Sequence, residues 1–147
     1  MRWQFLDKIT NILKWESIEA VKAVSFEEYQ LYAPLGRQGA FPESLLIECC
    51  TELIRYLVAY SSQEENMTLL SELADFKIHN SAGRGALLKL SAKIVERTSD
   101  EVSAECFIHN GDELTATGQL KCSIHRLSEF IDKSYIHEKM REVYGTP

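Results

Sequence analysis

The spacing of apolar residues changes near residue 74, and this change limits the possible folds more than any other feature of the sequence. Residues 42–62 carry apolar side chains around most of a helical circumference, which is typical of a helix buried on nearly all sides. Four later segments instead alternate apolar and polar residues, which predicts antiparallel strands with one buried face. One such helix and one such sheet predict a two-layer α+β domain in which the sheet curls around the helix.

The first half of the chain contains the predicted helix and less regular segments. Residues 3–14 have the spacing of a short amphipathic helix, and residues 17–26 are rich in Val and Ile, which predicts a first strand. Residues 31–43 contain two prolines and two glycines and are expected to be irregular. The long helix is expected to begin at Pro42 and to continue to about residue 62. Residues 63–72 are expected to form a solvated connection with some helical character.

The second half contains the predicted antiparallel strands. The Asn110-Gly111 pair predicts a hairpin turn between the last two of them, and residues 98–100 predict a weaker turn. Residues 126–144 return to helical spacing. The strands are expected at residues 74–80, 86–99, 101–110 and 113–125. No linker or repeat divides the chain, so we expect a single domain over residues 1–147 with a C-terminal helical extension at about 126–147.

Composition excludes several functional classes. The 147 residues contain 16 Lys and Arg against 22 Asp and Glu, and this net charge of -6 lacks the basic footprint of a nucleic-acid-binding protein. No apolar run is long enough to predict a membrane span. The N-terminal segment mixes charged with apolar residues, unlike a secretory signal.

The cysteines do not have the spacing of a zinc site or of a redox motif, and the four histidines do not supply the missing ligands. The four cysteines are Cys49, Cys50, Cys106 and Cys122. We expect them to be reduced thiols that pack as small hydrophobic side chains. The sequence therefore predicts no metal site, no cofactor and a cytoplasmic protein.

Three charged residues inside the long helix share one stripe. Glu48, Glu52 and Arg55 are spaced i, i+4 and i+7. Partial burial and the nearby Glu52 both favour the protonated form of Glu48, which suits an acid–base residue. In the alternative interpretation Glu52 and Arg55 form an ion pair, and Glu48 only faces a dimer partner.

Several segments together resemble the hot-dog fold, and in particular the FabZ-type 3-hydroxyacyl-acyl-carrier-protein dehydratases. Residues 5–9 (FLDKI), 20–24 (AVKAV) and 74–77 (ADFK) are similar to the entry segment and to two strands of that family. Residues 41–48 (FPESLLIE) are similar to the second half of its signature, and Glu48 falls on the family's catalytic Glu. The resemblance implies a hot-dog domain in which an antiparallel β-sheet wraps around a long central α-helix.

The main departure from the family concerns its catalytic histidine. Counting back from Pro42 without a gap, the position of that histidine is occupied by Pro34, and no histidine precedes His79. Dehydration of a 3-hydroxyacyl thioester needs a base for the α-proton, an acid for the leaving hydroxide and a donor to the thioester carbonyl. Proline has neither an ionisable group nor a backbone N–H, so it cannot replace the histidine.

The resemblance also implies further site residues. The helix N-terminus near Ser44 corresponds to the donor for the thioester carbonyl, and the expected substrate-binding residues are Gly36, Phe41, Ser44 and Glu52. Arg37 and Lys77 are candidates for docking an acidic carrier protein or a phosphopantetheine phosphate, or else they are ordinary solvated charges.

The sequence leaves three functional hypotheses open. The first is a dehydratase-like protein that acts on or binds acyl thioesters, carried by acyl carrier protein or by CoA, in fatty-acid or related lipid or polyketide synthesis. The second is a non-catalytic hot-dog subunit that partners a histidine-bearing paralogue, and the third is an acyl thioesterase that uses Glu48. In each case we expect a homodimer or a hetero-oligomer, because a single curled sheet leaves an edge strand uncovered. The C-terminal helix is expected to cover the outer face of the sheet or to contact a partner chain.

Overall fold

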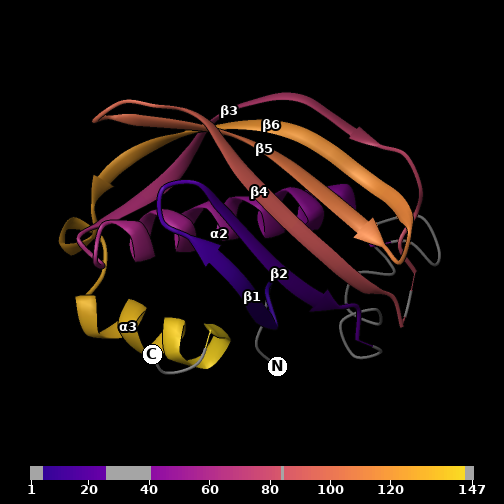
Figure 1. Ribbon diagram of the computed structural model, residues 1–147, viewed down its shortest axis with the longest axis horizontal. Coiled ribbons are helices and arrows are strands. Elements are labelled where there is room, and N and C mark those ends of the chain that lie inside the picture. Colours follow the sequence, from indigo (N-terminus) through magenta and orange to yellow (C-terminus); the bar gives the residue numbers. More distant parts are fainter. Residues whose placement is uncertain (1–4, 26–40, 84, 145–147) are drawn as a thin grey trace.

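An antiparallel sheet of six strands curves over one long helix in the computed structural model, which describes residues 5–25, 41–83 and 85–144 (Figure 1). The strand order is β1-β2-β4-β5-β6-β3, so the two edge strands are β1 and β3. The elements are β1 (Lys8–Leu13), β2 (Ser17–Ala23), α2 (Glu43–Ser61), β3 (Asn66–Ile78), β4 (Leu87–Arg97), β5 (Glu101–Asn110), β6 (Glu113–Arg126), the 3-10 turn η2 (Leu127–Glu129) and α3 (Lys133–Tyr144). This arrangement confirms the predicted α+β architecture.

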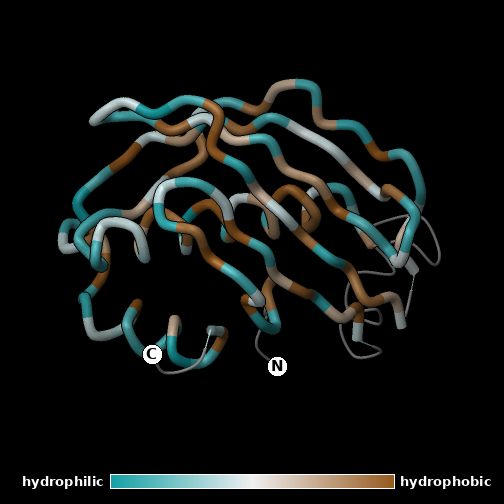
Figure 2. The backbone as a smooth tube through the Cα atoms, viewed as in Figure 1, coloured by the Kyte–Doolittle hydropathy of each residue, from teal (hydrophilic) through white to brown (hydrophobic). Residues whose placement is uncertain are grey.

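Helix α2 lies in the hollow of the sheet, as predicted. It starts directly after Pro42, and Glu43 places a negative charge in its first turn, where the helix dipole favours an anion. Its side chains are buried on most of its circumference, and Figure 2 shows hydrophobic stretches along the helix and along the strands above it. The fully buried members include Cys49, Leu53, Ile54, Leu57 and Val58.

Strands β4, β5 and β6 also follow the predicted alternation. Alternate residues of each strand face α2, and the positions expected to face inward on β4 and β5 are buried or partly buried. Gly111 turns the chain between β5 and β6 with φ +63, a conformation that glycine adopts without steric cost.

Thr115 departs from the prediction that it points outward into solvent. It is buried at a register shift of the hairpin, where the backbone N–H groups of His79 and Asn80 donate to its carbonyl.

The helix predicted at residues 3–14 is wrong, because residues 8–13 of this segment form strand β1 and pair with β2. Ile9 and Ile12 both face the core, opposite Ala20 and Ile18 of β2. A strand normally brings every second residue to the same face, but the register shifts at Thr10 and adds one residue between the two isoleucines. The resulting spacing of three imitates the periodicity of a helix.

The same effect explains why residues 63–72 were wrongly expected to form a connection. The turn after α2 is short, with positive φ values at Gln63 (55) and Glu64 (64), and β3 begins at Asn66. Register shifts after Leu70 and after Ala74 then disturb the alternation of β3. As a result, the apolar residues that share the inner face of the sheet are unevenly spaced, and they are Leu70, Leu73, Phe76 and Ile78.

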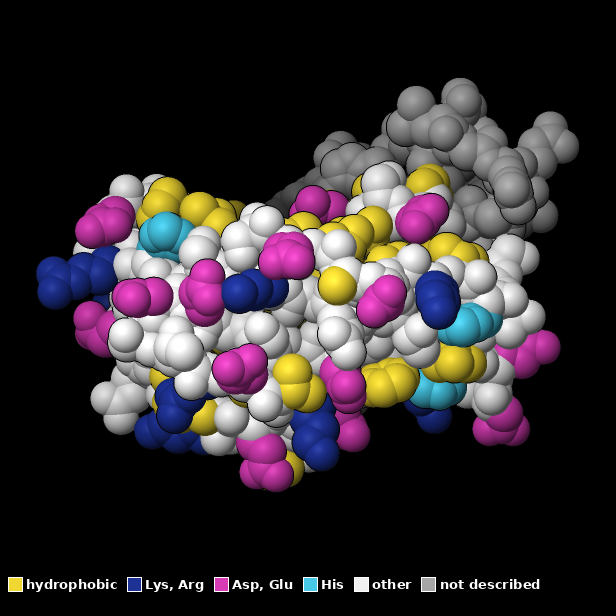
Figure 3. Space-filling view, turned by 90° about the horizontal axis from the view of Figure 1, so that it is seen from above, with side chains coloured by type: hydrophobic (Ala, Val, Ile, Leu, Met, Phe, Trp, Pro, Cys, Tyr) yellow, Lys and Arg dark blue, Asp and Glu magenta, His cyan; other side chains and the backbone are white. Residues whose placement is uncertain are grey.

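Helix α3 does not cover the outer face of the sheet, the first of the two positions expected for it, and its contact with a partner chain stays a prediction. It lies below α2, on the side away from the sheet, and it also contacts β1 (Figure 1). Ile136, Met140 and Val143 are its buried side chains. No helix of the described residues covers the outer face of the sheet, and Figure 3 shows Lys, Arg, Asp and Glu side chains interspersed over it. The helical extension therefore adds a third layer beneath α2.

Candidate functional site

The polar stripe of α2 lies on the face of the helix that the sheet does not cover. Glu48 is exposed, whereas Glu52 and Arg55 are partly buried. The Nη1 atom of Arg55 lies 2.7 Å from the Glu52 carboxylate, and its Nε atom donates to the carbonyl oxygen of Thr68 on β3 at 3.2 Å. Glu52 and Arg55 therefore form the expected ion pair and leave Glu48 as the exposed carboxylate of the stripe.

Burial and neighbouring charges both act on the pKa of Glu52. Burial raises the pKa of the Glu52 carboxyl, and the negative charge of Glu48 raises it further. The Arg55 guanidinium and a hydrogen bond from Tyr56 oppose this increase without cancelling it. The effect of Glu48 on this pKa shows that the two carboxylates act on each other along the stripe.

The start of α2 offers backbone donors close to Glu48. The first N–H groups of any α-helix have no partner within the helix, and no side chain caps this one. Ser44 is exposed in this first turn, four residues before Glu48 and therefore on the same side of the helix. Phe41 is buried, and its N–H donates to the carbonyl of Ala82 at 2.6 Å, which fixes the entry into the helix.

The other predicted site residues do not join this group in the described part of the chain. Lys77 is exposed on β3 opposite Thr117, on the outer side of the sheet. Pro34, Gly36 and Arg37 lie outside the described residues, so their predicted roles stay predictions.

Three of the four histidines are engaged away from the stripe. The ring of His79 bonds to Thr117 Oγ1 at 3.0 Å, and the ring of His125 bonds to Ser123 Oγ at 2.7 Å. His137 of α3 bonds to the Glu64 carboxylate at 2.7 Å. These contacts give Glu48 no histidine partner of the kind the dehydratase chemistry uses.

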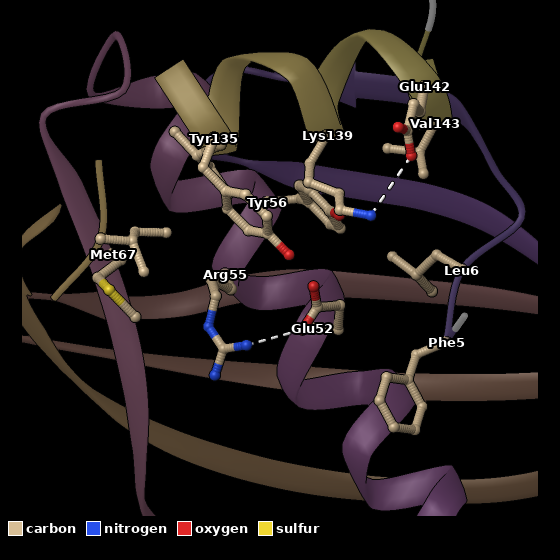
Figure 4. A pocket seen from close by; sticks show the side chains of 12 residues that line it. Phe5, Leu6, Glu52, Arg55, Tyr56, Met67, Tyr135, Lys139, Glu142 and Val143 are labelled. Carbon is tan, nitrogen blue, oxygen red and sulfur yellow. Dashed lines mark hydrogen bonds and ion pairs between the residues drawn. The ribbon is translucent and has the colours of Figure 1, made fainter. Parts of the chain in front are cut away.

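A cavity of about 380 Å³ lies between α2 and α3, one helical turn along the stripe from Glu48 (Figure 4). Six of its lining residues are apolar: Phe5, Leu6, Met67, Ile131, Ile136 and Val143. Glu52, Arg55 and Tyr56 line it from α2, whereas Tyr135, Lys139 and Glu142 line it from α3. In Figure 4, Tyr135 reaches from α3 toward the Glu52–Arg55 pair, Lys139 turns toward Glu142, and Phe5 and Met67 lie on opposite sides.

Of the cavity's polar residues, only Glu52 was expected to be functional. Tyr56 continues the stripe at i+4 from Glu52, so the helical period contained a signal for it. Tyr135 and Lys139 carry no such signal, because their position depends on where α3 packs.

Within the described residues, no group of three or more His, Cys, Asp or Glu side chains is placed to hold a metal ion. All four cysteines belong to this part of the chain, and none forms a disulfide. Nor does the described part contain a helix that is long and apolar enough to cross a membrane.

The comparisons with known proteins bear on the fold. No family model and no curated protein matches the sequence. Among solved structures, the chain is similar to a hot-dog-like protein from Thermanaerovibrio acidaminovorans, with a TM-score of 0.65 and 12% identity over 92% of this chain and 93% of that one. The chain has the hot-dog fold.

Two further hot-dog structures differ in their chemistry. The dehydratase heterocomplex ApeI:P from Xenorhabdus doucetiae is similar with a TM-score of 0.66 and 14% identity over 93% of this chain and 89% of that one. A hypothetical thioesterase with coenzyme A from Streptococcus pneumoniae is similar with a TM-score of 0.63 and 11% identity over 81% of this chain and 85% of that one. The hot-dog fold is thus shared by dehydratase and thioesterase structures, and it does not single out the FabZ-type family.

Proposed function

We propose that the chain acts on or binds acyl thioesters as a dehydratase-like hot-dog protein, with Glu48 as its acid–base residue. The observation that supports this proposal is the position of Glu48, an exposed carboxylate on the face of the central helix that the sheet does not cover. It lies one turn after the helix start, where backbone N–H groups are available to a thioester carbonyl. Ser44 and Phe41 shape this helix start, and Glu52 continues the site along the stripe.

Dehydration requires more than Glu48. A base must take the α-proton of a 3-hydroxyacyl thioester, and the C–O bond at the β-carbon must break while the leaving hydroxide takes up a proton as water. Glu48 can serve one of these roles, but no histidine is present to serve the other. We therefore propose that a second hot-dog subunit completes the site.

The inner face of β3 supports this second subunit. Leu70, Leu73 and Ile78 pair with buried residues of β6 but are themselves 36 to 41% exposed. An edge strand with exposed apolar side chains favours pairing with another chain. We propose that a second copy or a histidine-bearing paralogue covers this face. A chain that only stabilises such a paralogue corresponds to the non-catalytic alternative. The similar ApeI:P structure is a dehydratase heterocomplex, which supports a proposal with two different chains.

Hydrolysis is the second candidate reaction. A carboxylate can activate water for attack on a thioester carbonyl without any histidine. The exposed position of Glu48 and the lack of a histidine partner both suit this chemistry.

The carrier of the acyl group, acyl carrier protein or CoA, is part of the proposal, and Arg37 and Lys77 remain candidates for docking it. The reduced cysteines support the expected cytoplasmic location.

Turnover by the Glu48→Gln variant tests the proposal. Purified protein is assayed with 3-hydroxyacyl and saturated acyl thioesters on CoA and on a carrier protein, alone and with a histidine-bearing hot-dog partner. Glu43→Gln is the matched control, because it removes the same charge from an exposed position on the same helix. We expect Glu48→Gln to lower turnover by about 10²-fold or more and Glu43→Gln to leave it nearly unchanged.

The products identify the reaction. Enoyl product formation that depends on Glu48 supports dehydration, whereas free acid supports hydrolysis. Activity that needs the partner but not Glu48 supports the non-catalytic subunit. A protein that neither binds nor converts any of these thioesters would contradict the proposed function.

A further inference from the structure

The cavity between α2 and α3 begins about one helical turn along α2 from the candidate acid–base residue. Glu52 lines the cavity and lies four residues after Glu48, which corresponds to about 6 Å along a helix. The two carboxylates also influence each other electrostatically. A ligand whose reacting carbons lie at Glu48 therefore needs to extend by only about one helical turn to enter the cavity.

The size and walls of the cavity fit the end of an acyl group. Its volume of about 380 Å³ lies in the range of small-molecule sites. Leu6 and Phe5 from the N-terminal segment, Met67 from β3, and Ile136 and Val143 from α3 supply apolar walls. These walls favour a hydrocarbon body.

The polar groups of the cavity do not favour a plain hydrocarbon. The Glu52–Arg55 pair is separated by 2.7 Å and the Lys139–Glu142 pair by 3.4 Å, and all four side chains line the cavity. An alkyl chain would displace water from these pairs without offering a replacement hydrogen bond, which is unfavourable.

The charges also disfavour an ionic ligand. Two cations and two carboxylates line the cavity, so their formal charges cancel and leave no net charge to hold an ion. A neutral hydroxyl group suits these partners because it donates one hydrogen bond and accepts others. The Tyr135 hydroxyl and the Lys139 ammonium, both carried by α3, are available as donors.

We propose that the α2–α3 cavity receives the acyl end of the thioester bound at Glu48 and selects acyl groups that carry a neutral oxygen substituent, such as a hydroxyl, beyond the reacting carbons. This inference rests on the proposed function. It gives α3 a specific role, because Tyr135 and Lys139 then determine which acyl groups bind.

Paired ligands test the selection. The affinities of butanoyl-, hexanoyl- and octanoyl-CoA are compared with those of the same chains carrying a terminal hydroxyl, and acetyl-CoA serves as a ligand too short to enter the cavity. For at least one of these three chain lengths, we expect the hydroxylated acyl-CoA to bind about two- to tenfold more tightly than the acyl-CoA without the hydroxyl. Equal affinities at every length would contradict the inference.

Two tyrosines of α3 provide a matched pair of variants. Tyr135→Phe removes only a hydroxyl from the cavity, and we expect it to reduce the preference for the hydroxylated chain while leaving acetyl-CoA binding unchanged. Tyr144→Phe removes a hydroxyl from the same helix outside the cavity, where Tyr144 packs against Tyr60, and we expect no change. Equal effects of the two variants would show that the selection does not come from the cavity.

Methionine methyl NMR locates the acyl end. The chain has three methionines, and Met67 lines the cavity whereas Met140 does not. We expect the long hydroxylated thioester to shift the Met67 methyl signal and acetyl-CoA to leave it in place. Tight binding without a Met67 shift would overturn the inference while the proposed function stands. If no thioester binds, including acetyl-CoA, both fall.

Discussion

Glu52 combines a charge with partial burial, and this combination gives the fold a specific dependence on pH. Burial is the main cause that raises the pKa of the Glu52 carboxyl above its ordinary value of 4.5. At a pH between that ordinary value and the raised pKa, Glu52 is protonated in a larger fraction of folded chains than of unfolded chains. The stability that Glu52 contributes is therefore fully present at low pH, and it is lost as the pH rises through the raised pKa.

Comparison of the wild type with Glu52→Gln isolates this contribution. We expect the difference in free energy of unfolding, wild type minus variant, to fall as the pH rises above about 4.5 and then to level off. Urea denaturation at a series of pH values measures it.

Glu65→Gln is the control with the opposite sign. The hydrogen bond from Lys133 lowers the pKa of the exposed Glu65 carboxyl. The difference in free energy of unfolding between the wild type and Glu65→Gln should therefore rise with pH. A Glu52 difference that also rises with pH would contradict the assignment of burial as the dominant cause.

At the scale of single elements, α3 is attached by two kinds of contact. Ile136, Met140 and Val143 are buried, whereas the ion pairs Lys133–Glu65 and His137–Glu64 lie at the surface. Surface ion pairs contribute little because water screens them, whereas removing a buried aliphatic side chain costs both transfer free energy and a cavity.

Ile136→Ala should therefore loosen α3 far more than Lys133→Ala does. We expect a cost of about 2–4 kcal/mol for Ile136→Ala and little change for Lys133→Ala. Amide hydrogen exchange measures both, and it should accelerate in α3 while β5 keeps its protection. A larger effect of Lys133→Ala, or equal acceleration in β5, would show that α3 is not a separate unit held by its apolar face.

The elements also show which parts of the fold could be predicted from the sequence. Helix α2 and strands β4 to β6 were predicted because their periods of burial run almost without interruption, as in the alternation of Val102, Ala104 and Cys106. Strand β1 and the first part of β3 were missed, whereas the strand expected at residues 74–80 matches the last part of β3 as far as Ile78. Bulges space inward residues three apart in both strands, as for Ile9 and Ile12 of β1. A one-residue insertion in a strand leaves the pairing intact but changes the period on which the prediction depends.

The candidate site was predictable to a similar extent. Glu48 and Glu52 were found because a helical stripe is a local pattern and because the segment around them resembles a known family. Tyr135 and Lys139 could not be found, because they reach α2 only through the packing of α3, and sequence spacing contains no information about that contact.

At the scale of the whole molecule, the exposed inner face of β3 predicts self-association or association with a related chain. Leu73→Glu would place a charge on this face, opposite the buried Leu120, and it should shift the protein toward monomer. Light scattering coupled to size-exclusion chromatography measures the change in mass.

Leu87→Glu is the matched control for this prediction. Leu87 is 52% exposed and precedes the inward-facing Leu88 on β4, so it points to the outer face of the sheet. We expect its mass to remain that of the wild type. Loss of association in Leu87→Glu but not in Leu73→Glu would place the interface on the outer face instead.

The strand order has a consequence for how the chain matures during synthesis. Strand β3 pairs with β6, and Asn66 at the start of β3 meets Arg126 at the end of β6. A ribosome makes β3 well before β6, so β3 has no strand to pair with among the described residues until β6, the last strand, has emerged. Until then, the apolar side chains of β3 and the open hollow around α2 are both accessible. The nascent chain is thus most vulnerable to misassociation in the interval between synthesis of β3 and completion of β6. The pairing of β3 with β6 also slows folding, because the two strands are far apart in the sequence.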